Sequence, residues 1–162
     1  MIVIGYQGIG KSTIAGSDNY IDLESGTFWV DGRRDPEWYK PYCQIALHLH
    51  TQGYTVLLSS HEVVREYLKQ IESYEDRMAT FVCYPDTWLK NAWINKLRER
   101  YVETQLDKDY KAWQNAEARF AENIDELAHS GFKKIILETM RYSLKEELSA
   151  ARDRISDRKE LL

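Results

Sequence analysis

Short apolar runs of strand length recur along the chain, and helical patterns lie between them. The runs cover residues 2–4, 20–23, 54–58, 79–84 and 134–137. Such alternation of strands and amphipathic helices is typical of a parallel sheet that is covered by helices. The pattern therefore predicts an α/β fold with one sheet of five strands.

The segment from residue 86 to residue 130 carries no strand signal and predicts two helices instead. Its apolar positions recur at helical spacing: Leu89, Trp93, Leu97 and Tyr101 in the first helix, then Trp113, Ala116, Phe120, Ile124 and Leu127 in the second. We expect a helical hairpin here and a further amphipathic helix over residues 143–162. Ser59 and Ser143 each stand three residues before a glutamate, a capping-box spacing that marks two more helix starts.

Length and composition favour a single domain over residues 1–162. The chain is 43% hydrophobic and 30% charged, and none of its apolar runs approaches the roughly 18 residues that a membrane-spanning helix needs. Met1 leads straight into an apolar run without a basic region or a cleavable segment, so nothing marks the chain for export. We expect a cytoplasmic protein with no membrane partner.

Charge and cysteine usage narrow the classes of partner and metal. Proteins whose main role is to bind nucleic acid are usually positively charged, whereas the net charge of this chain is −4. A nucleic-acid partner is therefore disfavoured without being excluded. Cys43 and Cys83 are far apart and belong to no Cys/His cluster, which argues against a disulfide scaffold and a zinc site. We expect two buried thiols.

One motif carries specific chemistry. Residues 5–12 read GYQGIGKS, which fits the P-loop pattern G-x-x-x-x-G-K-[ST] and lies directly after a strand and at the start of a helix. Glycines let such a loop wrap closely around phosphates, so that backbone N–H groups point into one anion-binding nest. Lys11 would then reach the β- and γ-phosphates of ATP, and the Ser12 hydroxyl would bind Mg²⁺. The expected nucleotide-binding residues are Gly8, Ile9, Gly10, Lys11, Ser12 and Thr13.

With this motif the chain resembles the P-loop kinases of the nucleoside monophosphate kinase type, and especially the small predicted nucleotide kinases of bacteriophages and prophages. The resemblance covers most of the chain in element order, and GYQGIGKST is its specific part. It implies the three-layer sandwich of P-loop NTPases, a five-stranded parallel sheet in the order 2-3-1-4-5, and ATP-dependent phosphoryl transfer in the cytoplasm of the source cell or phage host. It also implies a mobile lid after the fourth strand, which here is the segment 86–130.

The second strand run ends in two carboxylates. Period-two alternation puts Asp22 and Glu24 on one side of the strand, near the carboxyl edge of the sheet where α/β proteins bind ligands. Similar kinases place an acidic residue here to orient the acceptor hydroxyl or to hold Mg²⁺ through water, and Asp22 is the best match. A solvated strand end is the competing interpretation.

The third strand run lacks an expected acidic residue. It ends Ser59-Ser60-His61, where many P-loop proteins carry an aspartate that supports Mg²⁺. This departure puts a conventional Walker B role in doubt and leaves Asp22 or Glu138 as substitutes. His61 and Arg65 lie one helical turn apart and are candidates for lining the acceptor pocket, with a packed or surface histidine as the alternative for His61.

Two further basic segments are candidate phosphate ligands. Arg33 and Arg34 lie close to where monophosphate kinases hold the acceptor's phosphate, and a guanidinium suits that task because it binds bidentately. Segment 90–100, with four basic residues and one acidic residue, resembles the R-L-x-x-R lid segment of guanylate kinases, with Lys96 and Arg100 at the arginine positions. Basic groups on a closing lid stabilise the charge that phosphoryl transfer spreads over the equatorial oxygens. Solvated charges are the alternative for both segments.

The prediction that follows is an enzyme that uses Mg²⁺ to move the γ-phosphoryl group of ATP to a small acceptor, foremost a (deoxy)nucleoside monophosphate. Lys11 would bind the phosphates of ATP, and Asp22 would orient the acceptor. Arg98 or Arg100 would stabilise the developing charge, with Arg119 as a further candidate for that role. Three alternatives stay open: a kinase that acts on a DNA end or a modified base, a nucleotide-dependent switch or assembly factor, and a kinase of a non-nucleotide metabolite. The base and sugar of the acceptor and the oligomeric state do not follow from the sequence.

Overall fold

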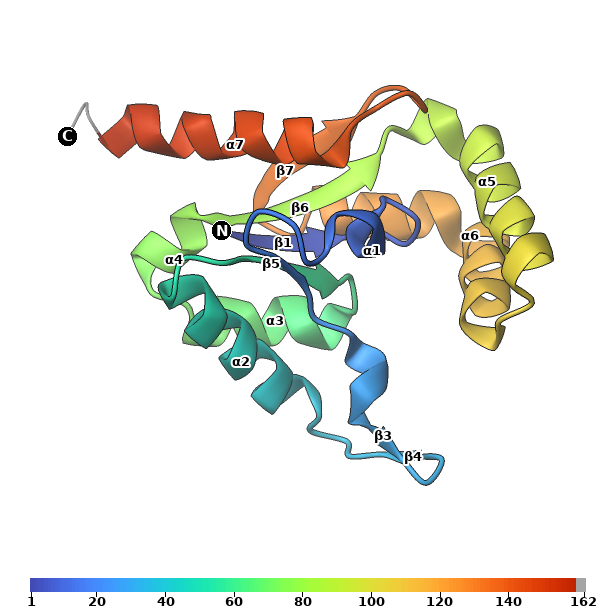
Figure 1. Ribbon diagram of the computed structural model, residues 1–162, viewed down its shortest axis with the longest axis horizontal. Coiled ribbons are helices and arrows are strands. Elements are labelled where there is room, and N and C mark those ends of the chain that lie inside the picture. The colour runs from blue at the N-terminus through green and yellow to red at the C-terminus, as the bar shows by residue number, and fades with distance from the viewer. Residues whose placement is uncertain (160–162) are drawn as a thin grey trace.

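A computed structural model describes residues 1–159 of the protein. One parallel sheet forms its centre (Figure 1). Its strands in chain order are β1 (Ile2–Gly5), β2 (Tyr20–Asp22), β5 (Thr55–Ser59), β6 (Thr80–Pro85) and β7 (Lys133–Leu137). They lie side by side in the order β2-β5-β1-β6-β7, with all neighbours parallel. Counted along the chain this is the order 2-3-1-4-5, so the expected α/β fold and sheet order are confirmed.

The central position of β1 explains its sequence. Val3 of β1 lies opposite Leu57 of β5 on one side and Phe81 of β6 on the other. All four residues of β1 are buried, because a central parallel strand is covered on both faces and needs no alternation of polar residues. The strand ends at Gly5, opposite Ser59 of β5, so the P-loop leaves the sheet in the middle of its carboxyl edge.

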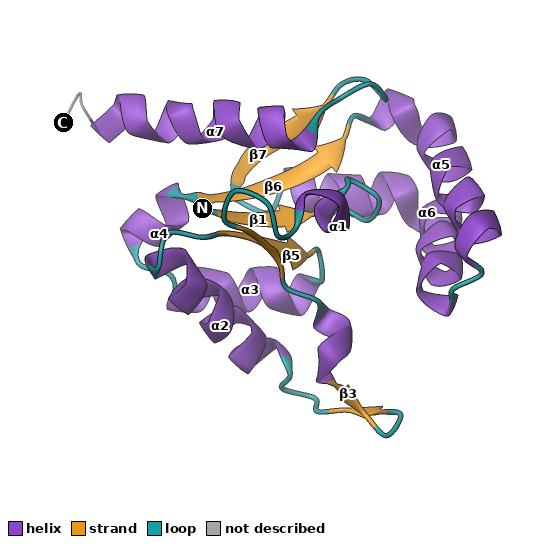
Figure 2. Cartoon of the chain, viewed as in Figure 1, coloured by secondary structure: helices purple, strands orange, loops and turns teal. Residues whose placement is uncertain are grey.

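Helices cover both faces of the sheet (Figure 2). They are α1 (Lys11–Ile14), α2 (Tyr39–Thr51), α3 (Glu62–Ile71), α4 (Tyr74–Met78), α5 (Lys90–Thr104), α6 (Asp107–Ala128) and α7 (Leu144–Lys159), with 3-10 turns η1 (Ser25–Phe28) and η2 (Thr87–Leu89). Helix α1 packs against α7, whereas α2 packs against α3 and also against β5 and β1. None of the described helices combines the length and the apolar character that crossing a membrane requires.

The predicted helical hairpin is present as α5 and α6, which pack against each other along their length. Trp93 and Leu97 of α5 and Phe120 of α6 are buried, as their spacing predicted. Helix α6 is kinked at Arg119, whose φ of −136° and ψ of 20° are not helical. Helix α6 packs on β6, and Ile124 and Leu127, which follow the kink, are buried.

Three local expectations need correction or completion. Residues 29–34, where no strand was predicted, form a short hairpin of β3 (Trp29–Val30) and β4 (Arg33–Arg34). The predicted capping box at Ser59 is absent: α3 has no side-chain cap hydrogen bond, and Ser59 still belongs to β5. The helix expected to run to residue 162 is described as far as Lys159, and its last three residues lie outside the described part of the chain. Both cysteines are free and buried, as expected.

Candidate active site

A cleft of about 1120 Å³ opens at the carboxyl edge of the sheet, between the P-loop, the β3–β4 hairpin and the α5–α6 hairpin. Among the residues predicted from the sequence, those lining it are Gly8, Gly10, Lys11, Ser12, Thr13, Asp22, Glu24, Arg34, His61, Arg65, Lys96, Arg100 and Arg119. Its volume slightly exceeds the range of about 300–1,000 Å³ that is usual for one ligand pocket. Arg33, Arg98 and Glu138 are exposed elsewhere and do not line the cleft.

The P-loop needs glycine at two of its positions. Gly8 and Gly10 have φ values of 83° and 100°, a conformation that side chains with a Cβ rarely adopt. At Gly8 space is also short, because a Cβ there would lie 2.8 Å from Cδ2 of Leu97 on α5. The loop is therefore pressed against the base of the helical hairpin.

Lys11 begins the short helix α1 and points back over the loop. Its Nζ donates a hydrogen bond to the carbonyl of Gly5, at 3.0 Å. Burial lowers the pKa of Lys11, and the nearby carboxylate of Asp22 counteracts this effect. The ammonium thus lies on the floor of the cleft with one backbone partner, where a phosphate would give it stronger charge compensation.

Asp22 is the carboxylate best placed to support a metal ion. It ends β2 and lines the cleft together with Ser12, and burial raises its pKa while the charge of Lys11 lowers it. Within the described residues no group of three or more His, Cys, Asp or Glu side chains could hold a metal ion by themselves. This fits Mg²⁺, which is commonly held by one or two protein groups plus the phosphates of a substrate.

The β3–β4 hairpin positions one arginine of its pair. The guanidinium carbon of Arg34 lies 3.2 Å from the ring centre of Trp38 and 5.8 Å from that of Trp29. Its NH2 donates to the carbonyl of Ser25 at 3.2 Å, whereas its buried Nε has no hydrogen-bond partner in the described structure. Arg33, the preceding residue of the same strand, is exposed and does not line the cleft. Arg34 is therefore a preorganised cation with an unused donor beside the cleft.

The start of α3 brings His61 and Arg65 to the same side of the cleft. His61 Nδ1 is 2.9 Å from Ser59 Oγ, and its ring meets Trp38 edge-on at 5.3 Å. Burial, followed by the charges of Arg34, Lys11 and Arg65, lowers the pKa of His61. The imidazole is thus kept neutral in a cationic part of the cleft.

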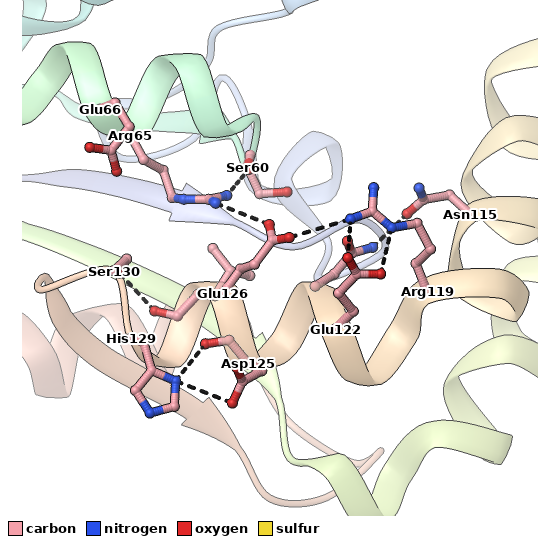
Figure 3. Close-up of polar contacts among 12 residues, drawn as sticks. Ser60, Arg65, Glu66, Asn115, Arg119, Glu122, Asp125, Glu126, His129 and Ser130 are labelled. Carbon is pink, nitrogen blue, oxygen red and sulfur yellow. Dashed lines mark hydrogen bonds and ion pairs between the residues drawn. The ribbon is translucent and has the colours of Figure 1, made fainter.

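A carboxylate that the sequence analysis did not single out joins two of the candidate arginines (Figure 3). Glu126 of α6 accepts from buried Arg65 at 3.2 Å through Oε2 and from Arg119 at 3.3 Å through Oε1. Arg65 also donates to the Ser60 carbonyl, and Arg119 makes a two-point contact with Glu122 at 2.7 and 2.8 Å. Both arginines therefore rest on acidic partners within the cleft wall.

The basic residues of α5 have three different positions. Arg98 is exposed outside the cleft. Arg100 and Lys96 both line it. Arg100 pairs with Asp109 of α6, and Lys96 donates to the Gly8 carbonyl of the P-loop at 2.8 Å. The segment that resembled a lid thus forms contacts within the protein rather than presenting three free cations to the cleft.

Residues 1–155 match the model of a family that is described as an AAA domain, one of the P-loop NTPase families. No curated protein and no solved structure matches the chain.

Proposed function

Because the chain belongs to this AAA domain family of P-loop NTPases, we propose that it is an ATP-dependent phosphotransferase that acts on a small phosphorylated acceptor, foremost a (deoxy)nucleoside monophosphate. The P-loop with Lys11 and Ser12 is the nucleotide side of the site. The sheet order, which is the one that the resemblance to monophosphate kinases implies, supports the kinase assignment.

The observation that carries the proposal is a second group of cations, from outside the P-loop, that lines the same cleft. Arg34 and Arg65 line the same cleft as Lys11, and come from the β3–β4 hairpin and from α3. Arginine is suited to a phosphate or carboxylate because its planar fork donates two parallel hydrogen bonds. One cleft lined by cations from separate elements suits two anionic ligands, as phosphoryl transfer between them requires.

The reaction would bring an oxygen of the acceptor phosphate onto the γ-phosphorus of ATP. A bond forms between these two atoms, the bond from the γ-phosphorus to the bridging oxygen breaks, and ADP leaves with the electron pair. Lys11 and the loop amides would hold the phosphates of ATP, and Ser12 and Asp22 would hold Mg²⁺, which neutralises charge that develops on the transferred group. Arg34 and Arg65 would orient the acceptor phosphate, which lowers the entropic cost of the encounter.

An acceptor panel scored by ADP release tests the proposal. With MgATP and each common nucleoside monophosphate and deoxynucleoside monophosphate, at least one acceptor is expected to stimulate ADP release and to become phosphorylated. In that reaction Arg34→Gln is expected to raise the acceptor KM about tenfold or more, because a charge-assisted hydrogen bond is lost. Arg33→Gln, on the same strand but outside the cleft, is the matched control and is expected to leave the KM unchanged.

Two results would contradict a phosphotransferase that acts on a small acceptor. Slow ATP hydrolysis that no acceptor changes would instead favour a nucleotide-dependent switch or assembly factor. Phosphate transfer to the 5′ end of an oligonucleotide, with a binding affinity that falls steeply with salt, would favour a nucleic-acid kinase.

A further inference from the structure

Three consecutive carbonyls of the P-loop are each held by a side chain from outside the loop. Trp93 Nε1 donates to the Gln7 carbonyl at 3.0 Å, and Lys96 Nζ donates to the Gly8 carbonyl at 2.8 Å. The hydroxyl of Tyr142 donates to the third carbonyl, that of Ile9, at 2.9 Å. Trp93 and Lys96 belong to α5, whereas Tyr142 lies between β7 and α7, so two distant segments meet at the loop (Figure 1).

These three contacts also determine where the amides of the loop point. A peptide unit is planar and trans, so its N–H points opposite to its C=O. When the carbonyls of residues 7, 8 and 9 face the clamping side chains, the N–H groups of Gly8, Ile9 and Gly10 face the other way. No described residue accepts a hydrogen bond from these three N–H groups. They are therefore available as donors to an anion.

The clamping side chains support one another. The rings of Trp93 and Tyr142 are stacked, with centres 6.0 Å apart and planes inclined by 13°. Lys96 Nζ lies 4.3 Å from the centre of the Trp93 ring and donates to the Tyr142 hydroxyl at 3.1 Å. Because that hydroxyl accepts from Lys96 and donates to the loop, each of its polar functions has a partner.

We propose that Trp93, Lys96 and Tyr142 form a clamp that sets the P-loop amides for triphosphate binding before the nucleotide arrives. This inference rests on the proposed nucleotide site. Trp93 and Tyr142 do not line the cleft, so they are positioning residues that act through the loop. Preorganised donors bind an anion more tightly because the loop does not have to be ordered during binding. Lys96 does line the cleft, but its ammonium already donates to the Gly8 carbonyl and to the Tyr142 hydroxyl, which assigns it to the loop rather than to the transferred group.

Calorimetric titration of the full chain with MgADP tests the clamp. Tyr142→Phe removes one hydroxyl and keeps the half-buried ring, and Lys96→Met removes the ammonium and keeps the stem. Each is expected to weaken MgADP binding roughly tenfold, the cost of one ordered hydrogen bond. Lys96→Arg retains a donor and is expected to recover part of the affinity. Lys90→Met on the exposed start of α5 and Tyr101→Phe farther along it are the matched controls, and both are expected to bind like the wild type.

Thermal melting of each variant separates loss of the clamp from loss of the fold, since the clamp variants are expected to melt close to the wild type. If Tyr142→Phe and Lys96→Met bind MgADP as tightly as the wild type, the clamp is wrong. If the wild type itself binds no MgADP, the nucleotide site is wrong, and the amide NMR signals of Gly8 and Gly10 then decide on the clamp. They are expected to be sharp in the ligand-free wild type and broadened in Tyr142→Phe, and unchanged signals overturn it.

Discussion

Arg100 of α5 donates a hydrogen bond to the carboxylate of Asp109 on α6, and only 1% of that aspartate side chain is exposed. Thr104 donates to the second carboxylate oxygen at 2.6 Å, next to the turn that joins the two helices. The carboxylate thus ties together both helices near the tip of the hairpin. An arginine that the sequence assigned to a developing phosphate charge has a buried structural partner.

Replacing this carboxylate is expected to loosen the hairpin. Asp109→Asn leaves Arg100 without its counter-charge and is expected to lower the free energy of unfolding by about 2 kcal/mol, as measured by urea denaturation. Asp107→Asn is the matched control, because the pair of Asp107 with Lys111 is solvated, with 75% of each side chain exposed, and is expected to show no measurable loss. Equal stability of the two variants would contradict a supporting role for Asp109.

The same pair predicts a pH dependence. Burial alone raises the pKa of Asp109, but the hydrogen bonds from Thr104 and Arg100 outweigh it and hold the pKa below the ordinary value of 3.8. A depressed carboxyl pKa stabilises the fold above the unfolded value, and that contribution is lost as the pH falls through the folded value. The stability difference between the wild type and Asp109→Asn is therefore expected to be constant near neutrality and to shrink below about pH 4.

Lys11→Met is expected to weaken nucleotide binding and to stabilise the ligand-free fold. Without the ammonium, MgATP affinity and turnover are expected to fall by about 100-fold or more, because the triphosphate loses its principal cation. The ligand-free protein is expected to become more stable at neutral pH. Burying the charged ammonium destabilises the folded state, as the lowered pKa of Lys11 indicates, and methionine removes this cost.

The stability that Lys11→Met gains over the wild type is expected to depend on pH. The unfolded lysine, with a pKa of 10.5, binds more protons than the folded one, so wild-type stability rises as the pH approaches 10.5 and the gain of the variant shrinks. Lys90→Met, at the exposed start of α5, is the control. Turnover that survives in Lys11→Met would refute the phosphate role.

Gly8→Ala is expected to disturb the P-loop through strain and contact together. An alanine at a φ of 83° costs about 1–2 kcal/mol, and its Cβ would press on Leu97 at 2.8 Å. We expect lower thermal stability and loss of MgADP binding. Gly26→Ala is the matched control, since its φ is not in the left-handed range and its Cβ would meet open space. Comparable MgADP affinities for the two variants would show that the loop conformation is not needed.

His61→Gln is expected to flatten the acid side of the stability profile. Because burial and the charges of Arg34, Lys11 and Arg65 lower the pKa of His61, the unfolded chain takes up a proton near pH 6.5 before the folded chain does. Wild-type stability is then lost as the pH falls below 6.5, and the variant lacks this loss. Urea midpoints at pH 8 and pH 5.5 measure it, and parallel profiles would contradict the pKa shift.

The strands were the predictable part of this fold. β1, β5 and β6 are central, so they appear in the sequence as unbroken apolar runs. The β3–β4 hairpin has only two residues in each strand, too few for alternation to show. Its Asp31-Gly32 turn, with both φ values positive, was the available signal, because an Asp-Gly pair favours the type I′ turn.

The partners of the candidate site residues were not predictable, because they depend on contacts between distant segments. Glu126 lies 61 positions from Arg65, and Tyr142 lies 133 positions from Ile9, so no local spacing connects either pair. The capping box predicted at Ser59 does not form for a related reason. Its hydroxyl is held by His61 at 2.9 Å and by Tyr42 of α2 at 3.4 Å, so it does not cap α3.

The two outermost strands of the sheet decide how other molecules can approach it. An edge strand exposes unpaired N–H and C=O groups, on which a second chain can add a strand and start aggregation. Here β2 at one edge has only three residues, and β7 at the other carries Lys133 and Lys134. Short strands and lysines both hinder such pairing. A protein that recognises this one is therefore expected to dock on its helices or loops rather than to extend its sheet.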